Sequence, residues 1–98
     1  IAKPAEHKGT LSVFPNPGNG LFTVSFIPEN PQNTYTYNVI NLVGQVVYTE
    51  IIAKTNVYSK QLDLSHLPKG TYYINLYVSR ANTESKKQLK QSRKIILH

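Results

Sequence analysis

The residues of this sequence that could do chemistry are few and lie far apart. Cysteine is absent, which excludes disulfides, thiolate zinc sites and a cysteine nucleophile. None of the three histidines, His7, His66 and His98, has a partner at the spacing of a metal site. The acidic residues that a paired-carboxylate mechanism would need stand one to a segment: Glu6, Glu29, Glu50, Asp63 and Glu84. We therefore expect a protein that is not an enzyme and that uses no metal or cofactor.

Two other clusters resemble ligand sites but lack the context that such sites need. Gly18-Asn19-Gly20 has the composition of a phosphate-binding loop, yet such a loop precedes a helix, and an alternating apolar segment follows here. The net charge is +6, and basic residues crowd the stretch KKQLKQSRK at 86–94. This stretch has neither the interleaved aromatic residues nor the helical pattern of a nucleic-acid contact. We predict a solvated loop that leads into the last strand, and no nucleic-acid partner.

Apolar and polar residues alternate with a period of two through most of the chain after residue 10, which is the pattern of half-buried strands. Clusters of Pro, Gly and Asn separate the alternating segments, and no window of ten or more residues keeps a helical period. The pattern predicts seven strands, at residues 11–14, 21–27, 34–42, 45–52, 57–64, 71–80 and 93–98.

Particular residues in these segments carry further predictions. Between the third and fourth strands we expect a hairpin turn in which Asn41 bonds back to the backbone and Gly44 takes the left-handed conformation. Tyr35, Tyr37 and Tyr72 fall on the apolar side of their strands, which favours core packing over a sugar-stacking face. Asp63 alternates out of the apolar face of its strand and is expected in solvent.

Length and patterning together indicate one all-β domain, because 98 residues leave no room for a second core. Seven short strands with frequent turns favour an immunoglobulin-like antiparallel β-sandwich. The polar residues 1–10 are interpreted as a linker, and no apolar run is long enough to span a bilayer. The final strand must pair for the sandwich to close, so we expect an ordered C-terminus. Open edge strands allow a strand-paired or domain-swapped homodimer when the domain is isolated.

Four short motifs in order identify a family that the chain resembles. Over residues 11–98 it is similar to the C-terminal sorting domain of type IX secretion cargo (the Por secretion system, type A). The matching segments are VFPNP with a later glycine, the apolar hairpin VINLVGQVV, DLS followed by LPKGTY, and the final KIIL. The residues that match the family motifs are Pro15, Asn16, Pro17, Gly20, Asn41, Gly44, Leu67, Gly70, Tyr72, Lys94, Ile95, Ile96 and Leu97. Two positions depart from the pattern, since Asn41 replaces an aspartate and His98 stands where the family commonly ends on lysine.

The resemblance implies a secretion signal at residues 11–98, covalently continuous with an upstream cargo domain, with residues 1–10 next to the cleavage region. It implies a route through the periplasm to the outer membrane and the cell surface or medium. The implied partners are the type IX translocon and a sortase-like protease that removes the domain. The alternative function is an accessory carbohydrate-binding or adhesion sandwich of an extracellular protein.

Overall fold

The computed structural model describes residues 8–52, 55–79 and 88–98, and within them the chain forms seven β-strands and no helix. The strands are β1 Leu11–Phe14, β2 Leu21–Phe26, β3 Thr34–Ile40, β4 Val46–Ile52, β5 Tyr58–Asp63, β6 Gly70–Ser79 and β7 Gln88–Leu97. These residues therefore contain no helix that could span a membrane. The predicted number and order of strands are confirmed.

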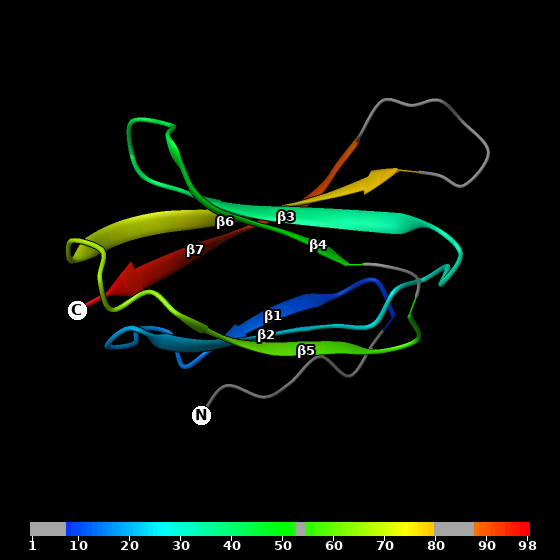
Figure 1. Ribbon diagram of the computed structural model, residues 1–98, viewed down its shortest axis with the longest axis horizontal. Coiled ribbons are helices and arrows are strands. Elements are labelled where there is room, and N and C mark those ends of the chain that lie inside the picture. The colour runs from blue at the N-terminus through cyan, green and yellow to red at the C-terminus, as the bar shows by residue number, and fades with distance from the viewer. Residues whose placement is uncertain (1–7, 53–54, 80–87) are drawn as a thin grey trace.

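The strands form two antiparallel sheets that pack face to face (Figure 1). One sheet has the order β1-β2-β5 and the other the order β4-β3-β6-β7. The chain therefore crosses from one sheet to the other after β2, after β4 and after β5. This is the arrangement of an immunoglobulin-like sandwich, as the strand pattern predicted.

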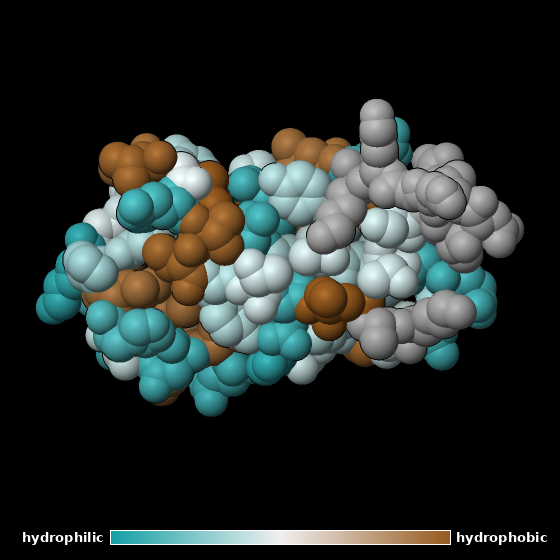
Figure 2. Space-filling model, turned by 45° about the horizontal axis from the view of Figure 1, so that its top comes forward, coloured by the Kyte–Doolittle hydropathy of each residue, from teal (hydrophilic) through white to brown (hydrophobic). Residues whose placement is uncertain are grey.

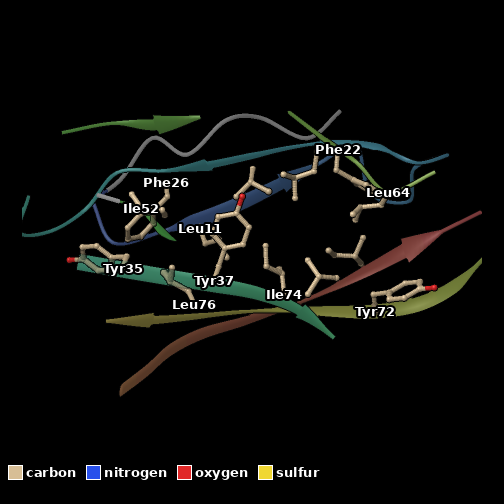
Figure 3. Packing of buried hydrophobic residues seen from close by; sticks show 14 of the residues in the cluster. Leu11, Phe22, Phe26, Tyr35, Tyr37, Ile52, Leu64, Tyr72, Ile74 and Leu76 are labelled. Carbon is tan, nitrogen blue, oxygen red and sulfur yellow. The ribbon is translucent and has the colours of Figure 1, made fainter. Parts of the chain in front are cut away.

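The core lies between the sheets and is built from the inward-facing residues of each strand (Figure 3). Phe26 from one sheet meets Tyr35 from the other with ring centroids 4.9 Å apart in an edge-to-face contact. The predicted core positions Tyr37 and Tyr72 are also buried. The full set of buried hydrophobic residues is Leu11, Phe22, Val24, Phe26, Tyr35, Tyr37, Val39, Ile52, Leu62, Leu64, Tyr72, Ile74, Leu76, Val78, Ile95 and Leu97.

The last strand is longer than the sequence pattern predicts. We expected a solvated loop at 86–94 and a strand only from 93, but β7 begins at Gln88 and pairs along nearly the whole of β6. Its first half lacks apolar alternation because the inward-facing Gln91 and Arg93 bond to polar backbone groups. The loop prediction is therefore wrong for residues 88–94, while Lys86 and Lys87 lie outside the described residues.

The core packing yields a first prediction. Phe22→Ala should lower the free energy of unfolding by about 3–5 kcal/mol, because it removes a fully buried ring and leaves a cavity. The neighbouring Leu21→Ala is the control, since Leu21 is exposed and its loss should cost less than about 0.5 kcal/mol. Chemical denaturation of both variants measures the difference, and equal effects would contradict the assigned register of β2.

Candidate functional site

The Asn16 side chain bonds to the last strand as a neighbouring strand would. Its amide nitrogen donates to the Lys94 carbonyl at 2.7 Å, and its amide oxygen accepts from the Ile96 backbone N–H at 3.0 Å. Asn16 lies between Pro15 and Pro17, and the peptide bonds before both prolines are cis. The exposed outer edge of β7 is thus closed by a side chain from a residue about eighty positions earlier in the chain.

Gly18 extends this contact with its own backbone. Its N–H donates to the Ile96 carbonyl at 3.0 Å, and its carbonyl accepts from the His98 N–H at 2.9 Å. Gly18 forms an isolated parallel bridge with Leu97. A Cβ atom on Gly18 would lie 2.7 Å from the Phe22 ring, so only glycine fits at this approach. We call residues 16–18 the clip, because with β6 they hold the end of β7 on both sides.

Gly20 joins the clip to the segment that contains the DLS motif. The Leu64 N–H donates to the Gly20 carbonyl at 2.7 Å. Gly20 has a φ of +131°, and a Cβ atom there would lie 2.8 Å from the Ser65 Cα. The Ser65 N–H and hydroxyl both donate to one Asp63 carboxylate oxygen, at 3.0 and 2.5 Å. These two bonds hold the pKa of the exposed Asp63 carboxyl below its usual value.

The β5–β6 connection is fixed by Tyr72. Its hydroxyl donates to the Pro68 carbonyl four residues upstream at 2.5 Å, which is the bond of a tyrosine corner. Leu67 packs against the core, and its N–H donates to the Leu64 carbonyl at 3.0 Å. Gly70 begins β6 with a φ of +148°, opposite Leu97. This motif therefore sets where β6 starts and where β7 ends.

The Asn41–Gly44 turn has the predicted geometry. The Asn41 side-chain oxygen accepts from the Val43 N–H at 3.1 Å and from the Gln45 N–H at 2.9 Å. The Gly44 N–H donates to the Asn41 carbonyl at 3.0 Å, and Gly44 has a φ of +87°. Asparagine therefore performs the turn-capping role without the charge of the aspartate that the family pattern has at this position.

All four motif segments lie at one end of the sandwich, together with the C-terminus (Figure 1). The clip bonds directly to β7, and Gly20, two residues after the clip, bonds to the DLS segment. The Asn41–Gly44 turn is placed at this motif end by the β3–β4 hairpin. In β7, Ile95 and Leu97 are buried, while Lys94 and Ile96 lie on the exposed face. The predicted motif residues are therefore partly core and partly surface.

Two side chains of β7 bond to the backbone of β1, a contact that the sequence motifs did not indicate. The Arg93 Nε donates to the Leu11 carbonyl at 3.2 Å, and the Gln91 side chain accepts from the Leu11 N–H at 3.0 Å and donates to the Gly9 carbonyl. Side chains of β7 thus close the outer edge of β1. Their spacing could have revealed them, because residues 91, 93, 95 and 97 alternate along one strand. Gln91 and Arg93 therefore lie on the same inward face as Ile95 and Leu97.

A shallow groove of about 270 Å³ runs beside this seam between β1 and β7. Two cations, Arg93 and Lys94, line it without an acidic or histidine side chain. No group of three or more metal-ligating side chains occurs among residues 8–52, 55–79 and 88–98. His66 and His98 are exposed, as predicted, and His7 lies outside the described residues.

On the side of the sandwich opposite the β1–β7 seam, polar side chains join the two sheets. The hydroxyls of Tyr37 and Tyr58 bond at 2.9 Å, and burial raises the pKa of Tyr37 well above its usual value. The Lys60 ammonium lies 2.8 Å from the Glu50 carboxylate, which also accepts from Tyr48 at 2.5 Å. The bond from Lys60 lowers the pKa of Glu50 and raises that of Lys60. These side-chain contacts link β3 and β4 of one sheet to β5 of the other.

The fold and its motif end define a small immunoglobulin-like sandwich whose distinguishing residues lie in its turns and last strand. The chain belongs to the family described as the secretion system C-terminal sorting domain, whose model matches residues 12–97. Comparisons with curated proteins and with solved structures gave no match. The domain is therefore a type IX secretion C-terminal sorting signal, which interacts with that machinery and belongs to a protein secreted through the outer membrane.

The clip can be tested without changing side-chain shape. Asn16→Asp replaces the nitrogen that donates to Lys94 with an oxygen, and we expect the free energy of unfolding to fall by about 1–3 kcal/mol. Asn19→Asp makes the same chemical change at an exposed neighbour and should alter stability by less than about 0.5 kcal/mol. Chemical denaturation compares the two, and an Asn16→Asp variant as stable as the wild type would show that the bond contributes nothing.

The Gly20 contact gives a second test at the motif end. Gly20→Ala combines an unfavourable φ with a clash against the Ser65 backbone, whereas Gly44→Ala meets open space and suffers only from its φ. We expect Gly44→Ala to cost about 1–2 kcal/mol and Gly20→Ala at least about 1 kcal/mol more. Thermal unfolding of both variants measures the order, and the reverse order would refute the close packing of Gly20 on Ser65.

Proposed function

We propose that this domain is a folded address for an upstream cargo and performs no reaction itself. The cargo travels through the periplasm, the translocon recognises the motif end, and a sortase-like protease removes the domain near residues 1–10 at the cell surface. Family membership supports the secretion role. The cargo, the cleavage step and the recognition surface are the parts that we add.

The observation that carries the proposal is the fixing of β7 on both edges. An isolated C-terminal tail of alternating residues would sample many conformations, whereas here β6 and the clip hold its backbone. The side chains of Lys94 and Ile96 are consequently displayed in a fixed geometry on the outer face. Because these side chains are already ordered in the free domain, less conformational entropy is lost when a partner binds them.

The carbohydrate-binding alternative has less support from the structure. A glycan platform needs a row of exposed rings, but Tyr35, Tyr37 and Tyr72 are buried and cannot stack on a sugar. Tyr73 and Tyr77 do lie on the outer face of the four-stranded sheet, where they are half-buried. The family match favours sorting over this use of the sandwich.

A reporter fused before residues 1–98, expressed in a cell with type IX secretion, tests the proposal. Deletion of residues 94–98 should abolish delivery to the surface, because it removes the exposed side chains of Lys94 and Ile96 as well as two core residues. Lys94→Glu combined with Ile96→Asp should keep the fold and reduce delivery about tenfold, since each side chain is exposed. Lys90→Glu combined with Leu89→Asp is the matched control, because it makes the same two changes at exposed residues near the beginning of β7, away from the motif end, and it should leave delivery unchanged. Normal export of the deletion would show that the C-terminal strand is not recognised.

A further inference from the structure

The four edge strands of the sandwich are not protected equally. Side chains from β7 bond to the backbone of β1, and the clip bonds to the backbone of β7. β5 and β7 also carry Lys60, Lys90 and Lys94, and charged residues of this kind discourage pairing with another chain. Among the described residues, no side chain bonds to the backbone along β4, which is the end strand of its sheet.

β4 is also apolar on the face that it exposes. Val46 and Ile51 face outward beside Ile40 and Thr36, and their exposed fractions are 55% and 62%. The adjoining turn presents Leu42 and Val43, which are 71% and 79% exposed. Figure 2 shows hydrophobic surface gathered at the left-hand end of the molecule, where Figure 1 places this turn. The strand VVYTEII has no lysine, arginine or proline, and its one charge, Glu50, is paired with Lys60.

We propose that the free edge of β4 is a strand-addition site for an extended, apolar segment of an acidic partner protein. An added strand would bond to the outward-facing backbone groups of β4 and place apolar side chains against Val46 and Ile51, with a polar residue near Thr49 between them. The inference rests on the proposed function, because a sorting signal must be bound by another protein. It adds a second contact surface, separate from the one that displays Lys94 and Ile96 at the end of β7.

Two observations favour a different protein over a second copy: the net charge of the chain, and the length of the exposed apolar surface on β4 and the adjoining turn. Each chain carries a net charge of +6, so two copies repel one another, whereas an acidic segment is attracted. Antiparallel self-pairing of β4 centred on Thr49 would cover only residues 46–52. The exposed Leu42 and Val43 lie beyond that range, and a longer strand from a partner would cover them as well.

Export of the reporter fusion is the first test. Val46→Lys combined with Ile51→Lys should leave the melting temperature nearly unchanged, because both side chains are exposed, and should reduce surface delivery about tenfold. Leu89→Lys is the matched control: it makes the same change on β7 at a residue that is 57% exposed, and it should export normally. Normal export of the β4 variant, or an equal loss with Leu89→Lys, would overturn the inference. Failure of the unmodified fusion would instead refute the proposed function.

Strand addition itself is tested on the purified 98-residue chain, independently of secretion. The probe is the capped peptide Glu-Thr-Val-Thr-Ile-Thr-Val-Thr-Glu, which is acidic and alternates apolar residues. At about 1 mM peptide, we expect NMR shifts and slower amide exchange at alternate residues of β4, and no change at β7. No response at β4, or a response at β7 alone, would overturn the inference. A dimer that protects β4 without peptide would show that the occupant is a second copy and would overturn the choice of partner.

Discussion

The structure depends on one set of hydrogen bonds, those between the Asn16–Gly18 clip and the outer edge of β7. They join residues about eighty positions apart, and they include both hydrogen-bonding atoms of the Asn16 side-chain amide. Closing so long a loop costs entropy, although this cost grows only slowly with loop length. Most of the cost is already incurred when the other strands of the sandwich pair. The two prolines beside Asn16 restrict the unfolded chain further, an effect of about 0.4–1 kcal/mol for each compatible proline. The opening motif and the closing motif of the family are therefore two halves of one contact.

The positions of the strands along the chain followed from the sequence because the signals are local. Alternation in residues 21–26 and 70–79 placed one face of each strand in the core, and the turn at Asn41–Gly44 followed from the chemistry of asparagine and glycine alone. The first half of β7 was missed because its inward-facing residues are polar. Gln91 and Arg93 face the edge of the other sheet, where backbone groups need partners, so a polar side chain is stabilising there.

The convergence of the motifs could not be predicted from their spacing. The sequence places Gly20 in a Pro-, Gly- and Asn-rich cluster between two strands, but its close packing on Ser65 depends on which strand lies beside β2. Likewise the sequence alone assigned KIIL to one apolar strand, whereas the pairing with β6 separates Ile95 and Leu97 in the core from Lys94 and Ile96 on the surface. Such roles come from topology, which single-sequence patterns do not encode.

The clip also makes residues 96–98 necessary for the finished seam. Ile96 and His98 each donate a backbone N–H to the segment around Asn16. A chain that has lost these residues, for example through trimming by an exopeptidase, cannot make these bonds, whatever the condition of its cargo. Removal of a few residues would therefore release two segments at once, the turn at residues 16–18 and the end of β7.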